Sequence, residues 1–331
     1  MSRPHVVVIG VGSIGERHLR CFGHTGRAEL SICEVNETLR NTIAQRYDVK
    51  HAYTDFADVA EARPDAVVIC TPAHCHIPMA IQLAEAGIDL LIEKPLGTSI
   101  NGVEPLFDAQ RTQQLTIAIA YVMRVNPLLA EVREAILSER FGRVVQVSTV
   151  SGQHFPTYRP AYRDIYYTDR ATGGGAIQDA LTHQVNAVEW LVGPMTRVAA
   201  DASHQILEGV EVEDTVHVIA RHGNVQSSFS LNQHQAPNET TMNIVCQRGT
   251  IQIEFHNQRW RWQSEPEQGW QLGSQFSLER DDMFVSQANM FLDAIESKSP
   301  VVCSLSEGLQ TLKANLAMLR AVDTHTWQAL E

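Results

Sequence analysis

Residues 5–15 read HVVVIGVGSIG, and this stretch decides the fold of the amino-terminal part of the chain. An apolar strand leads into three glycines at G-x-G-x-x-G spacing, and a helical stretch begins near Ile14. The first glycine allows a tight turn, the second lets the backbone approach a pyrophosphate, and the third lets helix and strand pack closely. Without a ligand, the same stretch would be an ordinary glycine-rich turn. We expect a dinucleotide at the start of the helix, contacted by Gly10, Gly12, Ser13, Ile14 and Gly15.

Glu34 ends the second predicted strand, which runs from about residue 29. A carboxylate at this position accepts hydrogen bonds from both hydroxyls of an adenosine ribose and repels a 2′-phosphate. No arginine follows it immediately, since the next residues are Val35, Asn36 and Glu37. The sequence therefore favours NAD as the cofactor over NADP. The alternative is a solvated carboxylate at a strand end.

Strands and helices alternate over the first 120 residues. Strands are expected at 5–10, 29–34, 66–70, 88–92 and 115–120, and helices from near 14 and at 37–46, 77–86 and 101–114. This alternation predicts a parallel, doubly wound sheet with right-handed crossovers. We therefore expect an α/β protein whose first domain is a Rossmann domain of residues 1–121.

The pattern changes over residues 122–331. A helix is expected between Asn126 and Gly142, a strand at 143–151, a loop at 153–171 and a further helix after the glycines at 173–175. Residues 214–263 then alternate as a β-meander, and helices near 282–297 and 306–321 finish the chain. The second domain is therefore expected to be α+β with an antiparallel or mixed sheet. A flat sheet face often needs covering, and dimerisation is one way to cover it.

Composition excludes several classes of partner. The 331 residues are long enough for two domains, and the formal net charge of −12 argues against nucleic acid or an anionic membrane as the main partner. No apolar stretch approaches the roughly 18 residues that a membrane span needs. The apolar amino terminus fits a first strand better than a signal peptide. The six cysteines lack C-x-x-C spacing and are expected to be reduced thiols in a cytoplasmic protein.

Glu93-Lys94-Pro95 follows the apolar run of residues 88–92. A lysine at the carboxyl end of a strand in an open α/β sheet points into the crevice where ligands bind. Pro95 biases Lys94 toward an extended backbone. Taken alone, the tripeptide fits a solvated strand end better than a ligand site, but its place after a glycine turn of the dinucleotide-binding type reverses that preference.

A second group of polar side chains falls in the helix expected after residue 175. At about 100° per residue, Asp179, His183 and Asn186 share one side, whereas the apolar residues 177, 181, 185 and 188 occupy the other. The alternative is an ordinary surface pair four residues apart. The three glycines at 173–175 favour a site, because they allow close approach of the backbone to a ligand or another chain.

Taken together, these motifs resemble those of the Gfo/Idh/MocA oxidoreductases. The resemblance extends over nearly the whole chain, in consistent order, and implies a nicotinamide cofactor and a carboxyl-terminal domain with a large open, mostly antiparallel sheet. Substrates of this family are mostly sugars, cyclitols and their derivatives, and dimers and tetramers built on the open sheet are common. The motifs that carry the resemblance are the glycine turn, residues 71–76, residues 93–95, residues 124–127, and residues 173–175 with Asp179 and His183.

The resemblance also implies roles for individual residues. Lys94 matches the lysine that touches both substrate and nicotinamide ribose, and Asp179 and His183 match the catalytic pair. Asn186 stands where many members of the family have a second acid, and Tyr121 replaces a small or amide residue. These two differences leave the identity of the substrate undetermined. Thr71, Pro72, His76 and Glu93 are expected beside the cofactor, and Arg124 beside the substrate.

Residues 155–163 resemble a subgroup linked with surface-polysaccharide or acidic amino-sugar pathways. Tyr158, Arg159 and Arg163 of this loop could bind a carboxylate, a phosphate or a polyol. The alternative is a solvated loop. A metal site is not expected, because His74-x-His76 has no third ligand at usable spacing.

The sequence thus predicts an NAD-dependent dehydrogenase that transfers hydride between nicotinamide and a secondary hydroxyl or carbonyl of a sugar, cyclitol or derivative. His183 is the expected base, and Lys94 stabilises charge on the reacting oxygen or carries the proton itself. A homodimer or homotetramer is expected. Two alternatives stay open: a glycosidase or lyase that oxidises its substrate transiently, and a non-enzymatic sensor of NAD or sugar.

Overall fold

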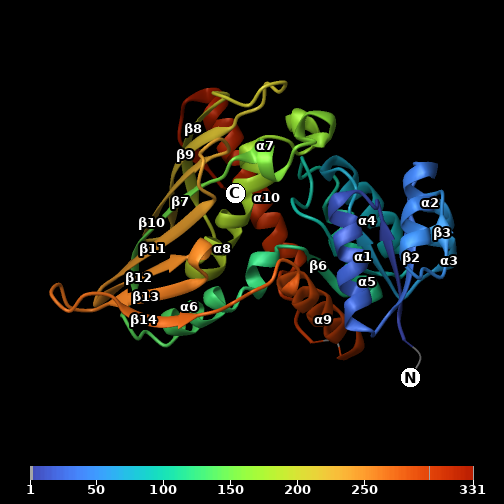
Figure 1. Ribbon diagram of the computed structural model, residues 1–331, viewed down its shortest axis with the longest axis horizontal. Coiled ribbons are helices and arrows are strands. Elements are labelled where there is room, and N and C mark those ends of the chain that lie inside the picture. The colour runs from blue at the N-terminus through green and yellow to red at the C-terminus, as the bar shows by residue number, and fades with distance from the viewer. Residues whose placement is uncertain (1–2, 298, 331) are drawn as a thin grey trace. The chain divides into compact units, whose positions relative to one another are not determined.

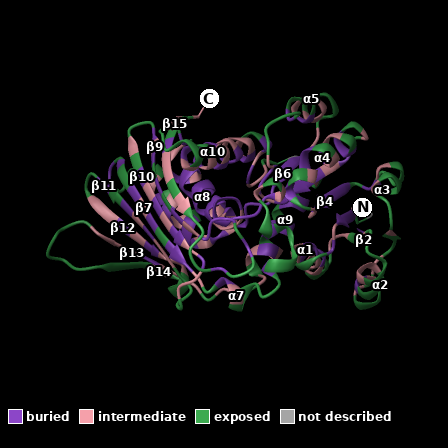
Figure 2. Ribbon diagram, turned by 90° about the horizontal axis from the view of Figure 1, so that it is seen from above, coloured by how far each residue is buried: buried purple, intermediate pink, exposed green. Residues whose placement is uncertain are grey.

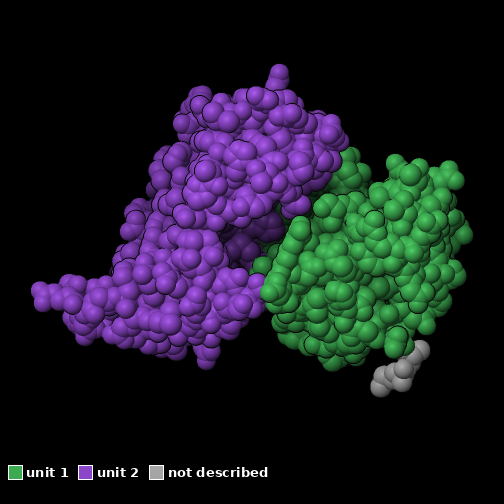
Figure 3. Space-filling view, in the orientation of Figure 1, with its two compact units in different colours: residues 1–122, 279–309 green, residues 123–278, 310–331 purple. Residues whose placement is uncertain are grey.

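The computed structural model describes residues 3–297 and 299–330, which divide into two compact units (Figure 3). The first unit comprises residues 1–122 and 279–309, and the second comprises 123–278 and 310–331. The first boundary lies one residue beyond the expected domain end at 121. Residues 279–309 differ from the expectation, because they group with the first unit and not with the rest of 122–331.

The first unit contains a six-stranded sheet of order β3-β2-β1-β4-β5-β6, and every neighbouring pair is parallel (Figure 1). This is the predicted doubly wound Rossmann sheet. The edge strand β3 escaped prediction because it has only two residues. The strands are β1 (His5–Ile9), β2 (Glu29–Cys33), β3 (Ala52–Tyr53), β4 (Ala66–Ile69), β5 (Asp89–Ile92) and β6 (Ile117–Ile119).

Helices complete the first unit, and one of them comes from far along the chain. Helix α9 contributes Ala288, Phe291 and Leu292 to the core formed by β1, β4 and α1. Burial of this apolar face explains why residues 279–309 belong to the first unit. The helices are α1 (Ser13–Thr25), α2 (Glu37–Arg46), α3 (Phe56–Ala62), α4 (His76–Glu85), α5 (Glu104–Gln113) and α9 (Asp282–Ser297).

The second unit contains a nine-stranded sheet of order β14-β13-β12-β11-β7-β10-β9-β8-β15. Only β7 and β10 pair in parallel, so the sheet is mostly antiparallel. The predicted meander is interrupted, because β7 lies between β10 and β11. The strands are β7 (Val144–Gly152), β8 (Arg197–Ser203), β9 (Thr215–His222), β10 (Val225–Asn232), β11 (Glu239–Cys246), β12 (Gly249–Glu254), β13 (Arg259–Gln263), β14 (Gln271–Gln275) and β15 (Gln328–Ala329).

One face of this sheet is covered and the other is open (Figures 1 and 2). The covered face carries side chains such as Val216 and Val218, which join the core formed with the helices of the unit. On the open face Val150 is 58% exposed and Ile219 is 53% exposed. The helices of this unit are α6 (Pro127–Leu137), the short α7 (Phe155–Tyr158), α8 (Thr182–Val192) and α10 (Leu305–Thr324), whose first turn belongs to the first unit.

Two further observations concern the helices and the cysteines. Among the residues that the structure describes, no helix is long and apolar enough to cross a membrane. All six cysteines are free thiols, and burial raises the pKa of Cys21, Cys33 and Cys246 to about 11.

Candidate functional site

The glycine turn between β1 and α1 has the geometry that a dinucleotide site needs. Gly10 has a φ of +79°, and a Cβ at Gly15 would overlap the carbonyl oxygen of Gly10. At Gly12, by contrast, a Cβ would meet no heavy atom of the described residues within 4 Å. Helix α1 begins at Ser13, so Ser13 and Ile14 lie in its first turn, where backbone N–H groups lack partners in the helix. Two glycines are therefore needed by the fold itself, and the third leaves room for a ligand.

Glu34 follows β2 and lies beside this turn. Its carboxylate accepts hydrogen bonds from the backbone N–H of Val11 at 3.1 Å and of Asn36 at 2.9 Å. The guanidinium of Arg40 donates to the carbonyl oxygen of Glu34 at 2.8 Å. Arg40 was not anticipated, because it lies six residues along the chain on α2 and only the fold brings it back to this strand end.

Glu93 and Lys94 follow β5 at the carboxyl edge of the same sheet. Glu93 is only 5% exposed, and its carboxylate contacts the ring of His18, on α1, at 2.7 Å and the backbone N–H of Lys94 at 3.0 Å. Burial acts to raise the pKa of Glu93, but His18 and Lys94 together hold it below its ordinary value. These contacts give Glu93 a role in fixing the strand end that carries Lys94. The peptide bond between Lys94 and Pro95 is cis.

His76 connects the loops that follow β4 and β5. Its Nδ1 lies 2.9 Å from the carbonyl oxygen of Pro95, and its Nε2 lies 2.7 Å from that of Thr71. Burial lowers the pKa of His76, although both carbonyl contacts oppose this effect. Thr71 is thus linked through the His76 side chain to the Lys94 loop, and Pro72 directly precedes the short 3₁₀ turn of residues 73–75. The ring nitrogens of His76 face carbonyl oxygens, an arrangement that disfavours the metal reading of His74-x-His76.

In the second unit, Asp179 and His183 lie on consecutive turns that follow the glycines. Residues 177–181 form a single π-helical turn, and α8 continues from Thr182. The expected apolar side is confirmed, since Ile177, Leu181, Val185 and Val188 are fully buried. Asp179 and His183 are both partly exposed, as a site requires.

Asn186 does not share their exposed side, contrary to the expectation from uniform α-helical spacing. It is buried, accepts a hydrogen bond from Arg124 at 2.8 Å and donates to Thr311 at 2.9 Å. The wider π-helical turn changes the angular relation between Asp179 and the residues that follow. π-Helical turns occur frequently at functional sites.

The residues expected at the substrate are distributed over two environments. Arg124 is 4% exposed and contacts Asn186 and the ring of Trp190, so its described contacts are internal. Arg163 is exposed, stacks on Tyr162 and donates to the carbonyl oxygen of Glu208 at 2.9 Å. Tyr158 is 50% exposed. Their contact with a substrate stays a prediction.

Tyr166 contacts the predicted site residue Asp179 and was not anticipated from the sequence. Its hydroxyl donates to the Oδ1 of Asp179 at 2.7 Å. It lies in the segment expected to be a loop, thirteen residues before Asp179. The only signal in the sequence was the abundance of tyrosine and arginine in that segment.

No group of three or more histidine, cysteine, aspartate or glutamate side chains in the described residues is arranged to hold a metal ion. The chemistry of this donor set is that of hydrogen bonding and proton transfer. The groups that stand out are the amine of Lys94 in the first unit and, in the second unit, the imidazole of His183, the carboxylate of Asp179 and the phenol of Tyr166.

Comparison with known proteins identifies the family. Residues 5–121 match the model described as an oxidoreductase family with an NAD-binding Rossmann fold, and residues 129–252 match the GFO/IDH/MocA C-terminal domain. The chain belongs to the Gfo/Idh/MocA family. The two matches follow the order that the motifs predicted, and the first domain is an NAD-binding Rossmann domain.

Relatives within the Gfo/Idh/MocA family are distant. The chain is 24% identical to the inositol 2-dehydrogenase of Rhizobium meliloti over 95% of its own length and 96% of that protein. It is 28% identical to the rhizopine catabolism protein MocA of Rhizobium meliloti over 58% of each chain. The chain thus spans little more than half the length of this second relative.

Solved structures of the same fold are also similar to this chain. A levoglucosan dehydrogenase in complex with NADH superposes with a TM-score of 0.90 over the full length of both chains, at 21% identity. This similarity shows that the two proteins share the same fold of Rossmann domain and mostly antiparallel sheet.

Proposed function

We propose that this protein is an NAD-dependent oxidoreductase that transfers hydride between nicotinamide and a secondary hydroxyl or carbonyl of a sugar, cyclitol or sugar derivative. One observation carries the proposal. The glycine turn after β1 and Lys94 after β5 lie at the carboxyl edge of one parallel sheet, where open α/β sheets bind their ligands. Inositol 2-dehydrogenase, a relative along nearly its full length, supports the substrate class.

Each unit supplies chemistry suited to this reaction. NAD supplies the hydride acceptor at the nicotinamide ring. Lys94 donates a hydrogen bond to the reacting oxygen and stabilises negative charge on it. His183 takes the hydroxyl proton during oxidation and returns it during reduction, because imidazole titrates near neutral pH. Asp179 orients the imidazole or binds a neighbouring hydroxyl. Lys94 is the alternative proton carrier.

The proposal includes a preference for NAD over NADP. The carboxylate of Glu34 beside the glycine turn suits the two ribose hydroxyls and repels a 2′-phosphate. Arg40 introduces a cation at the same strand end, which works in the opposite direction. The guanidinium of Arg40 is directed to the backbone carbonyl of Glu34. We therefore expect the Glu34 carboxylate to determine the choice of cofactor in favour of NAD.

A cytoplasmic enzyme that forms a homodimer or homotetramer completes the proposal. The open face of the nine-stranded sheet carries exposed apolar side chains such as Val150 and Ile219, and a second copy of the chain would cover them.

The test is a substrate panel of free sugars, inositols, sugar acids and nucleotide sugars, each with NAD and with NADP, followed by absorbance of the reduced cofactor. The proposal expects NADH to form with at least one polyol. Higher rates with NADP would overturn the argument from Glu34. Tightly held cofactor with substrate conversion but no net NADH would favour a glycosidase or lyase, and NAD binding without any turnover would favour a sensor.

A further inference from the structure

The segment of residues 153–175 meets the proposed catalytic helix through one tyrosine. Tyr166 opens a short 3₁₀ turn of residues 166–168, and its hydroxyl donates to the Oδ1 of Asp179 at 2.7 Å. Tyr166 is 38% exposed, and Asp179 is also partly exposed. The contact therefore lies at an accessible surface of the second unit and not in its core.

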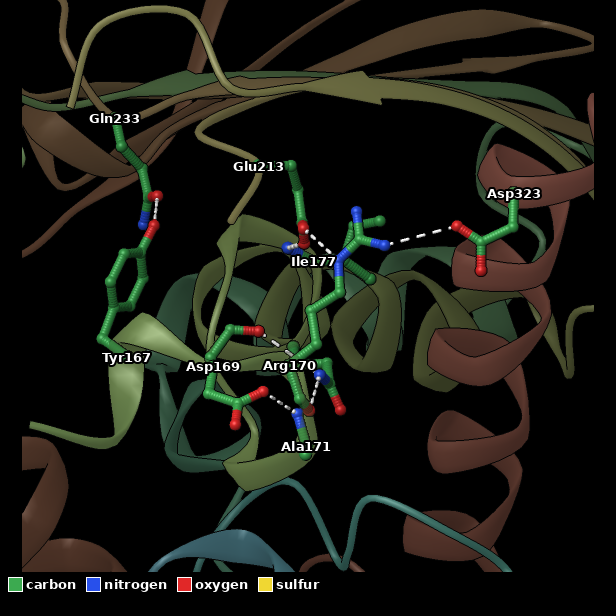
Figure 4. Close-up of polar contacts among 10 residues, drawn as sticks. Tyr167, Asp169, Arg170, Ala171, Ile177, Glu213, Gln233 and Asp323 are labelled. Carbon is green, nitrogen blue, oxygen red and sulfur yellow. Dashed lines mark hydrogen bonds and ion pairs between the residues drawn. The ribbon is translucent and has the colours of Figure 1, made fainter. Parts of the chain in front are cut away.

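The backbone of Tyr166 is fixed from both sides. Its carbonyl oxygen accepts a hydrogen bond from the Oγ1 of Thr172 at 2.7 Å. The next residue, Tyr167, is buried, packs against Phe155 at a ring-centroid distance of 4.7 Å and donates to Gln233 (Figure 4). Because Tyr167 anchors the turn in a small aromatic core, Tyr166 is directed outward to Asp179.

Glu213 fixes the start of the helix that carries Asp179 (Figure 4). The buried carboxylate of Glu213 accepts from the backbone N–H of Ile177 at 3.2 Å and from Arg170 at 2.7 Å. The backbone carbonyl of Glu213 accepts from the N–H of Ala176 at 2.9 Å. Arg170 belongs to the same segment as Tyr166, so one ion pair ties the segment and the start of the π-helical turn together.

We propose that Tyr166 is a positioning residue that sets the orientation and the ionised state of the Asp179 carboxylate. This inference rests on the proposed function, in which Asp179 takes part in the reaction. A phenol that donates to a carboxylate favours its charged form and restricts its rotation. The segment and the π-helical turn are anchored separately to the rest of the unit and to each other, so the fold holds the Tyr166 hydroxyl within hydrogen-bonding distance of Asp179.

The first test needs no substrate. The carboxyl carbon of Asp179 is followed by ¹³C NMR during a pH titration of protein labelled at aspartate, and Asp179→Asn assigns the signal. In Tyr166→Phe, we expect Asp179 to titrate about 0.5–1 unit higher than in the wild type, because the charged form loses a donor. An unchanged titration would overturn the proposal.

The matched control is Tyr167→Phe, which removes a hydroxyl from the adjacent residue of the same segment. Its hydroxyl contacts Gln233 and not Asp179. We expect Tyr167→Phe to lower the melting temperature and to leave the titration of Asp179 unchanged. If both variants shift that titration equally, the effect is general loosening of the segment, and Tyr166 has no specific role.

A double-mutant cycle separates this inference from the proposed function. With the sugar or inositol that yields NADH in the substrate panel, Tyr166→Phe should lower kcat about 5–10-fold at little cost in KM. In the Asp179→Asn background the same change should have little further effect. Full activity of Asp179→Asn would contradict the proposed function, whereas a loss confined to Asp179→Asn, with Tyr166→Phe normal, would contradict the role of Tyr166 alone.

Discussion

The two regions that carry the proposed chemistry are built by different means. In the first unit, Lys94 follows a strand whose neighbours in the parallel ladder fix its end, and the buried Glu93–His18 contact supports it from α1. In the second unit, Asp179 and His183 follow a glycine-rich segment without a ladder. Its position depends on side chains from remote parts of the chain, above all Glu213.

This difference shows which interactions hold the functional side chains in position in each region. A strand end is positioned by backbone hydrogen bonds, so many side-chain changes leave it in place. The segment of residues 153–175 forms no sheet ladder, so side chains contribute strongly to fixing its position. A small core joins Phe155, Tyr162 and Tyr167 of this segment to Leu207, Val210 and Val212.

The largest effect is expected at the contact that supports the first region. Glu93→Ala leaves the buried ring of His18 and the backbone N–H of Lys94 without their acceptor, and each buried donor left unsatisfied costs about 1–3 kcal/mol. Urea unfolding measures the loss. Because the pKa of Glu93 is lowered in the folded state, its contribution is complete above the ordinary value of 4.5 and disappears as the pH falls through the folded value. Equal stability of variant and wild type at pH 7 would contradict this account.

The next prediction separates an effect on the chemical step from an effect on NAD binding. Lys94→Ala and His183→Ala should each lower kcat by at least about 10², equivalent to roughly 3 kcal/mol, while NAD binding survives. Steady-state kinetics give kcat, and calorimetric titration with NAD gives the affinity. Near-normal turnover in both variants would show that neither residue takes part in the reaction. The two regions would then differ only in how they are held in position.

A smaller effect tests the support of the second region. The buried carboxylate of Asp214 accepts hydrogen bonds from the backbone N–H groups of Gln205, Ile206 and Leu207 and from the hydroxyl of Thr215. Asp214→Asn should cost about 1–3 kcal/mol of unfolding free energy at pH 7, because donors lose a charged acceptor.

The stability difference between the wild type and Asp214→Asn should depend on pH. Burial acts to raise the pKa of Asp214, but its hydrogen bonds outweigh burial and lower it below the ordinary 3.8. Its stabilisation is therefore complete above that value and is lost as the pH falls through the folded pKa. Thermal melts of the wild type and Asp214→Asn should converge in acid. A constant difference in stability down to acidic pH would contradict the assignment.

The smallest effect is expected at the glycine turn, where one glycine is needed for ligand binding and another for the fold. Gly12→Ala adds a methyl group to open space, so the melting temperature should be unchanged. The same methyl group would occupy room intended for the pyrophosphate, so we expect about a tenfold loss of NAD affinity. Gly15→Ala is the matched contrast, because its methyl group overlaps the backbone of Gly10 and should lower both stability and affinity. Unchanged affinity in Gly12→Ala would place the ligand elsewhere.

The sequence alone determined the parts of this protein that depend on local order. Hydrophobic runs punctuated by glycine predicted the parallel sheet, and the motif spacing predicted the glycine turn, Glu34 and Lys94 at strand ends. These predictions were possible because the carboxyl ends of parallel strands share one edge of a sheet. The family followed from the same motifs.

Only the tertiary structure decided the features that join distant parts of the chain. The assignment of α9 to the first unit, the insertion of β7 into the meander and the burial of Asn186 all depend on long-range packing or on a π-helical turn that periodicity does not reveal. The contacts of Arg40 with Glu34 and of Tyr166 with Asp179 belong to the same class. Side-chain hydrogen bonds between remote residues leave no periodic trace in a sequence, because their partners are brought together only by the fold.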